Sequence, residues 1–536
     1  MSEAPDSLHV VVVGAGISGL ATAWYLEQRA ATRDIAVKCT VLEQSERAGG
    51  KIVTDIVDAK PADGASTEAV PDAGPQSGRF VVEGGPDSFL AVQKPWGMQL
   101  SQELGLVDRL IGTNDKQQRV FVVSRGRTTR LPEGIFLLAP TRLIPFLRSP
   151  LISPLGKLRM GLDLLIPARK EEADETLGDF VKRRFGGEAL DKIAEPLLSG
   201  IYSAEVDRQS LLATFPRFLQ MEHEYGSLIR AMRAGRRRRP AVGAAASGGE
   251  AQSFEEAHPL DATGKALAVP PRSTFVSFGL GMSELTQGLL AHLSAKVRCG
   301  RTVVGIEPRG GRRGYGVRVR PTGADAGNSE IIEADAVVLA APAFASANML
   351  HAVAPTASRL LHTIRYVSSG TISLGYRQDA SWIPVCARLE GFGILVPASE
   401  KRPINAITWS SVKFPGRAPA GHSLLRVFFG GSRSPRSFDL EDEELLGVVK
   451  RQLLEIMGIQ EQPLFHRIHR WPRAIPQYDL GHLDRVAALE YSLPADIHVT
   501  GSPYRGIGIP DCARQAAETA ERVIEGLKAQ GGAPWR

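Results

Sequence analysis

Cysteine is scarce in this chain: there are four in 536 residues, and no two are spaced as a C-x-x-C pair. The scarcity excludes a disulfide-stapled fold and the usual structural zinc sites, and it fits a reducing compartment. Long apolar runs are missing too, since no stretch reaches the ~20 residues of a membrane-spanning helix. The N-terminus is short and partly acidic before the first apolar run, unlike a secretory signal peptide. We therefore expect a cytoplasmic protein, or one at the cytoplasmic face of a membrane.

A strong charge of one sign is also absent. The net charge of +6 and the pI of about 9.1 show only a mild basic excess, without a nucleic-acid-binding motif. This balance suits an anionic small molecule or lipid surface, and we expect no nucleic-acid partner. No catalytic triad or metal-ligand cluster stands out, so we predict no catalytic side chain and no metal. The length predicts more than one domain.

What the sequence does contain begins near its N-terminus. An apolar run, Val10–Val13, leads into G-x-G-x-x-G, and a helical pattern follows. A strand, a tight turn and a helix in that order are the context in which this pattern binds a dinucleotide. Gly14 allows the turn, Gly16 lets the backbone approach a pyrophosphate, and Gly19 lets helix and strand pack closely. The phosphates would meet the N–H groups at the start of the helix.

A second apolar strand, Val37–Leu42, ends in Glu43, 24 residues after Gly19 (43 − 19). A carboxylate at about that spacing hydrogen-bonds the ribose of a dinucleotide. Arg47 and the pair Gly49–Gly50 follow, and two glycines here indicate close approach of a ligand or of another backbone segment. These signals predict a nucleotide site and leave both NAD and FAD open.

The order E-x-x-x-R-x-G-G, from Glu43 to Gly50, resembles the FAD-binding fingerprint of the amine oxidase-like flavoproteins. Further stretches that resemble this family are E-G-G-P-D-S-F, a strand at 301–306, W-P-R-A-I-P-Q-Y and G-I-G-I-P-D-C. Cys512 stands in a Pro-Asp-Cys context, so we expect FAD to be bound without a covalent bond. The resemblance implies this set of FAD-binding residues: Gly14, Ala15, Gly16, Ile17, Ser18, Gly19, Glu43, Gln44, Arg47, Gly50, Lys51, Gly85, Pro86, Asp87, Ser88, Val303, Trp471, Ile507, Gly508 and Ile509.

The stretch E-P-L-L-S-G-I-Y, which begins at Glu195, narrows the resemblance to the porphyrinogen oxidases within this superfamily. A-T-F-P at 213–216 and G-F-G-I-L-V-P at 391–397 are similar to the same family. These stretches do not resemble the amine oxidases or the carotenoid desaturases. The resemblance implies a tetrapyrrole as the small-molecule substrate.

Three residues are implied at the substrate. Arg119 would pair with a propionate, Gly200 would border the tetrapyrrole with its backbone, and Phe392 would face a pyrrole ring. Each has a plainer interpretation: a solvated arginine at a strand edge, a glycine that caps a helix C-terminus, and an ordinary core aromatic.

The implied activity is FAD-dependent oxidation of a porphyrinogen to a porphyrin, a late step of heme biosynthesis, with O2 as acceptor and H2O2 as product. G-I-P-D-C and E-P-L-L-S-G-I-Y look more like the Gram-positive branch, which oxidises coproporphyrinogen III to coproporphyrin III. The alternative substrate is protoporphyrinogen IX, giving protoporphyrin IX. Two weaker rivals are an amine oxidase and a non-catalytic carrier on the same fold, like the Rab escort proteins.

The expected fold is α/β: a Rossmann-like FAD-binding domain of the amine oxidase and p-hydroxybenzoate hydroxylase type, a mixed-sheet substrate domain and a helical subdomain. We place the FAD-binding domain at 1–90, 272–310 and 481–536, the substrate domain at 91–130, 216–234 and 311–480, the helical subdomain at 131–215, and a low-complexity flexible insertion at 235–271.

Two further segments are ambiguous. Residues 57–78 are rich in Pro and Gly and predict an exposed insertion between two strands,. Residues 131–170 mix apolar residues, prolines and basic residues. They fit either a packed helical subdomain or a surface that dips into a membrane. In the second case the basic residues toward the headgroups would be Arg142, Arg148, Lys157 and Arg159. The sequence also leaves open whether the protein forms a homodimer.

Overall fold

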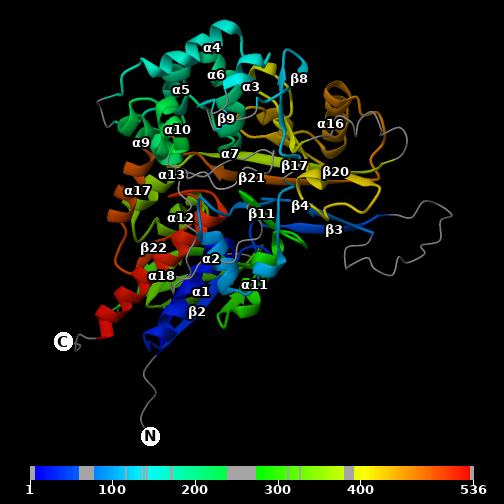
Figure 1. Ribbon diagram of the computed structural model, residues 1–536. Helices are drawn as coiled ribbons and strands as arrows, with labels where there is room; N and C mark the ends of the chain where they lie inside the picture. The colour runs from blue at the N-terminus through cyan, green and yellow to red at the C-terminus, as the bar shows by residue number, and fades with distance from the viewer. Residues whose placement is uncertain are drawn as a thin grey trace, which may run out of the picture.

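The computed structural model describes residues 7–59, 78–114, 117–132, 135–136, 139–140, 143–169, 173–237, 273–310, 313–324, 328–378 and 391–531. Most of the two insertions expected at 57–78 and 235–271, and Arg142, lie outside these residues. The described chain forms a parallel sheet between helices, a larger mixed sheet and a cluster of helices (Figure 1). Among the described helices, none has the length and apolar character that crossing a bilayer requires.

The parallel sheet is built around β1. The valines of β1 are buried on both faces of the sheet, as expected for a central strand of a parallel sheet. Along the sheet the strands are β12 (Lys296–Arg298), β2 (Val37–Leu42), β1 (Leu8–Val13), β16 (Ala336–Leu339) and β22 (Ile497–Val499).

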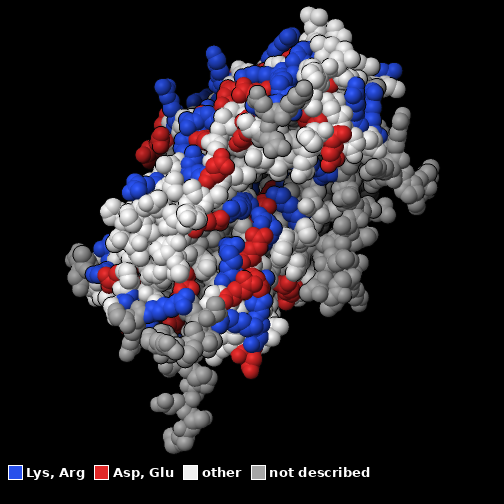
Figure 2. Space-filling model, turned by 90° about the vertical axis from the view of Figure 1, so that its left-hand side faces the viewer, with Lys and Arg blue, Asp and Glu red and all other residues white. Residues whose placement is uncertain are grey.

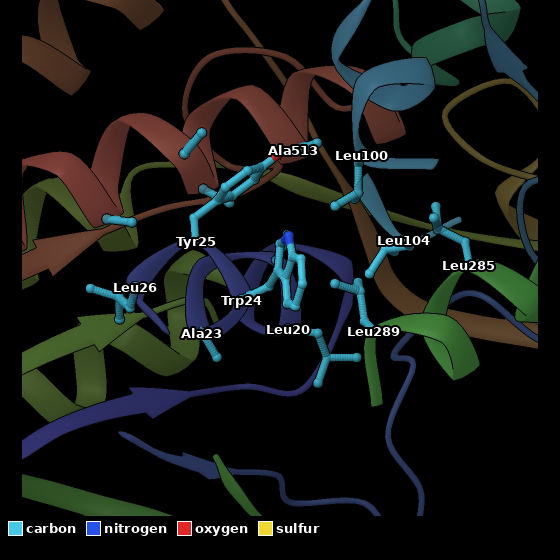
Figure 3. Packing of buried hydrophobic residues seen from close by; sticks show 14 of the residues in the cluster. Leu20, Ala23, Trp24, Tyr25, Leu26, Leu100, Leu104, Leu285, Leu289 and Ala513 are labelled. Atoms are coloured by element: carbon cyan, nitrogen blue, oxygen red, sulfur yellow. The ribbon is translucent and has the colours of Figure 1, made fainter. Parts of the chain in front are cut away.

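Helices cover one face of this sheet because α1 carries apolar residues at helical spacing,. Figure 3 shows Trp24 of α1 among leucines of α2 and α11, with Tyr25 on the side of α18. The four helices of this face are α1 (Ile17–Thr32), α2 (Trp96–Glu103), α11 (Ser283–His292) and α18 (Ile509–Gly531). The other face packs on β13 (Arg301–Pro308), β14 (Tyr315–Pro321), β15 (Glu330–Ala334), α12 (Ala343–Leu350), α13 (Pro355–His362) and α17 (His482–Tyr491).

The second sheet is mixed, because β18 and β7 run parallel while its other neighbours are antiparallel. Helix α16 (Asp442–Met457) packs on one of its faces. In order the strands are β21 (Phe465–Pro476), β17 (Tyr366–Arg377), β20 (His422–Gly430), β19 (Ala406–Trp409), β18 (Gly393–Leu395), β7 (Val120–Ser124) and β8 (Arg127–Arg130).

The helical cluster lies at the top of Figure 1, far from both chain ends. It shares one apolar core, which includes α9 and α10 beyond residue 215. Its elements are α3 (Leu143–Arg148), α4 (Pro154–Gly161), the 3-10 turn η3 (Leu162–Leu164), α5 (Leu177–Phe185), α6 (Gly187–Ala189), the π-helix η4 (Leu190–Ser199), α7 (Gly200–Tyr202), α8 (Leu211–Thr214), α9 (Pro216–Tyr225) and α10 (Leu228–Arg237).

Smaller elements join these regions. The hairpin β3 (Thr54–Asp58) and β4 (Arg79–Glu83) brackets the first insertion. The others are β5 (Phe89–Leu90), η1 (Val107–Arg109), β6 (Leu110–Gly112), β9 (Ile135–Phe136), β10 (Ala139–Pro140), β11 (Phe275–Phe278), η6 (Ala398–Glu400), α15 (Ser410–Lys413), η7 (Pro435–Phe438).

The architecture confirms the expected fold class. In the helical cluster, two of the basic residues of 131–170 bind carbonyls of the protein. Lys157 donates to the carbonyls of Leu147 and Ser149 at 2.7 and 2.8 Å. Arg159 donates to three carbonyls near the end of α5. Both cations therefore bind helix and loop carbonyls of the protein itself.

Candidate active site

The loop between β1 and α1 has the geometry of a phosphate-binding turn. Gly14 has φ = +105°, a conformation that favours glycine,. A Cβ on Gly19 would lie 1.8 Å from the carbonyl oxygen of Gly14, so only glycine lets α1 pack this closely. A Cβ on Gly16 would meet nothing nearer than Gly50 Cα, at 3.9 Å. The space beside Gly16 and the N-terminus of α1, where Ile17 and Ser18 lie, can therefore admit a phosphate.

Glu43 is tied into this loop. Its Oε2 accepts the backbone N–H of Ala15 at 2.8 Å, and its Oε1 accepts that of Ser45 at 2.9 Å. Each carboxylate oxygen has a second acceptor site. Glu43 can therefore order the glycine loop and still accept a ribose hydroxyl.

The strand that carries Val303, one of the predicted FAD-binding residues, lies next to Glu43. The carbonyl oxygen of Glu43 accepts the N–H of Arg301 at 2.7 Å. The register of β13 shifts between Val303 and Gly305, and such a bulge leaves backbone groups outside the strand ladder. Gln44 lies beside the residue that follows β14, because its backbone carbonyl accepts the Thr322 hydroxyl at 2.7 Å.

The loop after Glu43 folds back on the glycine turn. Arg47 holds it by donating from Nη2 to the carbonyl of Gly50 at 2.6 Å. A Cβ on Gly50 would lie 3.0 Å from Gly16 Cα, and one on Gly85 would lie 1.8 Å from the carbonyl oxygen of Lys51. Three backbone segments thus stack directly on one another, which explains glycine at each contact.

Lys51 lies within electrostatic reach of Cys512 on α18. The residue is exposed, and the surrounding protein lowers the pKa of its ammonium group, while Cys512 acts in the opposite direction. The loop that carries Lys51 is therefore brought to the start of α18.

The turn before α18 is held by Tyr478. The N–H of Gly506 donates to the Tyr478 hydroxyl at 2.8 Å, and that hydroxyl donates to the carbonyl of Ser502 at 2.6 Å. Tyr478 and Tyr202 pack against Ile507, which precedes Gly508 and Ile509 at the start of the helix. Tyr478 was in a family-like motif but not among the predicted site residues.

His482 packs against the ring of Tyr478. Its ring stacks on that of Tyr478 with centroids 3.9 Å apart, and its Nε2–H donates to the carbonyl of Tyr504 at 2.8 Å. Burial lowers the pKa of His482 to about 4, with the Tyr504 carbonyl, Arg485, Asp479 and Arg505 as smaller influences. The imidazole is therefore neutral in the folded protein at neutral pH.

A pH-dependent loss of stability follows from His482. Between its folded pKa of about 4 and its ordinary value of 6.5, only the unfolded chain binds the proton, so stability falls as the pH drops through this window. From neutral pH to about pH 5 the His482 contribution should fall by roughly 2 kcal/mol. Urea unfolding at both pH values checks this, with His482→Gln as the non-titrating control. An equal pH dependence in the variant would contradict it.

The loop Gly85–Ser88 lies between the glycine turn and the mixed sheet. Lys413 binds the Asp87 carboxylate at 2.9 and 3.1 Å, and the Ser88 hydroxyl donates to it at 2.7 Å. Burial acts to raise the pKa of Asp87, but the nearby cations Lys413 and Arg426 outweigh it and lower that pKa. Trp471 donates from Nε1 to the carbonyl of Gly84 at 2.8 Å, so this indole lies against the start of the loop.

Two of the predicted substrate residues are neighbours in the backbone. The N–H of Phe392 donates to the carbonyl of Arg119 at 2.7 Å, where β18 begins beside β7. By strand alternation Phe392 falls on the side of Ile394, which packs in the core under α16. The aromatic on the opposite side is the half-buried Phe428 of β20, which sequence patterns did not single out.

Gly200 lies elsewhere, at the end of a π-helix. Gly200 is the C-cap of that π-helix, with a right-handed φ of −55°. The chain continues as α7, and a positive φ follows at Ser203. Gly200 is exposed, and a Cβ on it would meet nothing within 4 Å. Two residues later Tyr202 contacts Tyr478, which brings this turn to the loop before α18. π-Helical turns often occur at functional sites.

The predicted nucleotide residues come from segments that contact one another. Glu43 binds the backbone of Ala15 and of Arg301, Gly50 lies against Gly16, and Gly85 lies against Lys51. Glycines at these backbone contacts fit the close approach of a dinucleotide such as FAD.

Comparison with known proteins identifies the family. Residues 17–524 match the profile of the family described as "Flavin containing amine oxidoreductase", and the chain belongs to that family. It is an oxidoreductase, and its cofactor is FAD.

Curated relatives match over nearly the whole chain. A protein named coproporphyrinogen III oxidase from Bacillus subtilis (strain 168) is 31% identical over 95% of this chain and 96% of its own length. One of the same name from Propionibacterium freudenreichii subsp. freudenreichii is 33% identical over 99% and 94%. A chloroplastic protoporphyrinogen oxidase from Oryza sativa subsp. japonica is 27% identical over 97% and 89%.

Solved structures agree with this fold. A crystal structure of a protein from Exiguobacterium sp. 255-15 has a TM-score of 0.76 and 27% identity, and covers 98% of this chain and 99% of its own. A putrescine oxidase structure has a TM-score of 0.62 at 17% identity, covering 97% and 99%. The latter likeness shows the fold alone.

Proposed function

We propose that this protein oxidises a porphyrinogen to a porphyrin, and that its substrate is coproporphyrinogen III. The observation that carries the proposal is similarity over at least 95% of the chain to proteins named coproporphyrinogen III oxidase. Those relatives are 28–33% identical, whereas the protoporphyrinogen oxidases reach 26–29%. Protoporphyrinogen IX is the second candidate, because the two groups overlap in identity.

The residues around the glycine turn would hold FAD. The N–H groups at the start of α1 would bind its pyrophosphate, and Glu43 would bind the adenosine ribose. Val303 and Gln44 would border the adenine. Toward the other end, Lys51, the Gly85–Ser88 loop, Trp471 and the turn Ile507–Ile509 would enclose the ring system. The N-terminus of α18 points its partial positive charge at that turn, which favours negative charge there.

Bound FAD supplies the redox chemistry, since it accepts two electrons with a proton at a time and can return them to O2. Conversion of a porphyrinogen to a porphyrin releases six electrons and six protons, which three O2 take up as three H2O2. The chain's part is to bind the tetrapyrrole against the cofactor and to exclude water. Buried Tyr202 and Tyr478 keep their protons, because burial raises both phenol pKa values.

An aerobic assay tests this function and separates its rivals. We expect purified protein to show a flavin spectrum and to generate porphyrin fluorescence and H2O2 from coproporphyrinogen III. A non-catalytic carrier would form no porphyrin above the rate without protein. An amine oxidase would form H2O2 from amines and not from the porphyrinogen.

Substrate charge leads to a prediction for Arg119. If this half-buried residue pairs with a propionate, Arg119→Ala should raise KM and leave flavin content unchanged, because uniform binding does not affect the chemical step. The loss of substrate-binding free energy should be about 1 kcal/mol or more if the pair is desolvated. Coproporphyrinogen has four propionates and protoporphyrinogen two, so the loss should be larger with protoporphyrinogen. Wild-type kinetics with both would remove Arg119 from the site.

We also propose that FAD is bound without a covalent bond. Cys512 is buried, its Sγ lies 3.9 Å from the carbonyl of Ile507, and burial raises the pKa of its thiol to about 11. It is therefore a neutral thiol and a poor nucleophile. Acid precipitation should release all flavin into the supernatant. Flavin that stays with the precipitated polypeptide would refute the assignment.

The surface of α3, α4 and η3 supports a proposal of peripheral membrane contact. Six large aliphatic side chains are 40–79% exposed there: Ile144, Leu147, Leu155, Leu158, Leu162 and Leu165. Arg148 is exposed beside them, and an exposed apolar patch with basic residues suits an anionic lipid surface. We expect binding to phosphatidylglycerol vesicles that Leu155→Glu/Leu158→Glu abolishes. Equal binding by the double variant would locate the contact elsewhere.

The remaining predictions about the whole protein stay proposals. We propose a division into domains at the boundaries derived from the sequence, a cytoplasmic location, and a homodimer. Sedimentation of the purified protein tests the last of these. Binding to nucleic acid is not expected. On the face that Figure 2 draws, basic and acidic side chains are mixed over the described residues.

A further inference from the structure

Arg426 is a buried cation that the proposed function does not yet use. It lies on β20 and is 3% exposed. Its neighbours Leu425 and Val427 point into the core under α16. Strand alternation therefore points Arg426 to the opposite side of the sheet, where the loop Gly85–Ser88 passes.

Arg426 binds that loop through its backbone. Its Nη2 donates to the carbonyl of Gly85, and more weakly to the Thr371 hydroxyl at 3.5 Å. The guanidinium also stacks 4.9 Å from the ring centre of Phe428. Its Nε is buried and has no hydrogen-bond partner among the described residues. A buried guanidinium with an unpaired donor costs stability, so we expect it to have a functional role.

Other donors hold the rest of the loop. Trp471 donates to the carbonyl of Gly84. The Ser277 hydroxyl donates to the carbonyl of Asp87 at 2.7 Å. Lys413 binds the Asp87 carboxylate. The segment from Gly84 to Asp87 is thus attached to the mixed sheet, to α15 and to β11, with Arg426 at the carbonyl of Gly85.

The charges that face Arg426 do not cancel it. Asp87 and Glu83 attract the guanidinium, but Arg417 pairs with Glu83 at 3.2 Å and Lys413 pairs with Asp87. Burial acts to lower the pKa of Arg426 while both carboxylates act to raise it. His469 faces it too, and is kept neutral by burial, which lowers its pKa. Arg426, Arg417 and Lys413 thus place three positive charges beside the loop, against the carboxylates of Asp87 and Glu83 and, beyond His469, that of Asp55.

We propose that Arg426 is a positioning residue, which fixes the Gly85–Ser88 loop against FAD and raises the tendency of FAD to accept electrons through its buried positive charge. The inference rests on the proposed function, because that places FAD at this loop. A fixed positive charge in a region of low dielectric favours the more negative, electron-rich form of a neighbouring group. Arg426 acts on FAD through the loop that it holds and through the electric field of its own charge.

Arg426→Met and Arg426→Lys test the proposal in the FAD-loaded protein. We expect Arg426→Met to keep FAD, to lower its midpoint potential in a dye-equilibration titration, and to change its visible spectrum. With a porphyrinogen substrate, kcat should fall on the order of 10- to 100-fold with KM nearly unchanged. Arg426→Lys, which keeps the charge but not the planar donor geometry, should restore most of the potential and less of kcat.

Arg470→Met is the matched control. Arg470 is on the same sheet and donates to the carbonyls of Phe438 and Leu440, away from the loop. Its loss should leave the potential and spectrum unchanged. A wild-type potential and kcat in Arg426→Met would overturn the proposal, and so would equal changes in both Met variants. If Arg426→Met does not fold, Arg426→Gln, which also removes the charge, takes its place: a lowered potential supports the proposal and a wild-type potential overturns it.

The potential measurement does not depend on the substrate. If the wild-type protein oxidises no porphyrinogen, the proposed function fails, while the shift in potential still decides the role of Arg426.

Discussion

Gly16→Val should give a folded protein that contains no FAD. A Cβ at residue 16 meets nothing closer than 3.9 Å within the protein, and the backbone φ of −75° suits any residue. The added side chain would instead occupy the space where a pyrophosphate meets the N-terminus of α1. Flavin absorbance after purification measures the loss, and circular dichroism measures the fold. A variant with full flavin would show that this loop does not bind the cofactor.

Gly19→Ala provides the contrast. Its Cβ would lie 1.8 Å from the carbonyl oxygen of Gly14, which the backbone cannot relieve without separating α1 from β1. This variant should lose stability as well as flavin. A pair of variants that both fold without flavin would mean that the two glycines have the same role, contrary to the geometry.

Arg184→Met should destabilise the helical cluster by about 3–5 kcal/mol, the usual cost of breaking a buried ion pair from one side. Arg184 is fully buried, and it binds Glu222 at 2.6 Å and Asp163 at 3.3 Å. It also donates to the carbonyl of Ile166 at 2.8 Å and that of Gly226 at 3.0 Å. Removal leaves Asp163 buried without its cation. Thermal or urea unfolding of the variant measures the effect.

Lys182→Met is the control for Arg184. Lys182 is on the same helix, and its ion pair with Asp207 at 2.8 Å is exposed on both sides. Exposed pairs contribute under about 1 kcal/mol. Equal stability losses in the two variants would show that burial does not set the contribution of the Arg184 network.

Features with local causes could be predicted from the sequence. The strand Val37–Leu42 was predicted and is observed with the same bounds, because an apolar run beside a turn specifies a buried strand by itself. The glycine turn and Glu43 are close in sequence, so their spacing alone indicated that they meet.

Features with distant partners could not be predicted in this way. Arg426 binds a carbonyl 341 residues away, and Trp471 one 387 residues away. Tyr478 holds a turn 28 residues later, which no spacing rule reveals. Each of these contacts exists only after the mixed sheet has packed on the nucleotide-binding region.

The region around Gly200 shows another reason why structure could not be predicted from sequence patterns. Pro196 lies inside the helix that precedes it, and proline usually ends a helix because it lacks an N–H donor. A glycine soon after such a proline suggests a helix end. The chain instead adopts a π-helix up to Ser199, which changes the hydrogen-bond spacing, and then continues as α7 from Gly200 to Tyr202. Sequence patterns built on the α-helical repeat do not anticipate this.

The most direct test of the account compares coproporphyrinogen III and protoporphyrinogen IX as substrates of the same purified flavoprotein. Porphyrin fluorescence and O2 uptake are followed together, with Gly16→Val as the flavin-free control. The account predicts oxidation of both to porphyrins, a higher kcat/KM with coproporphyrinogen III, and no turnover by the control. Porphyrin formation by wild type no faster than by the control would contradict it.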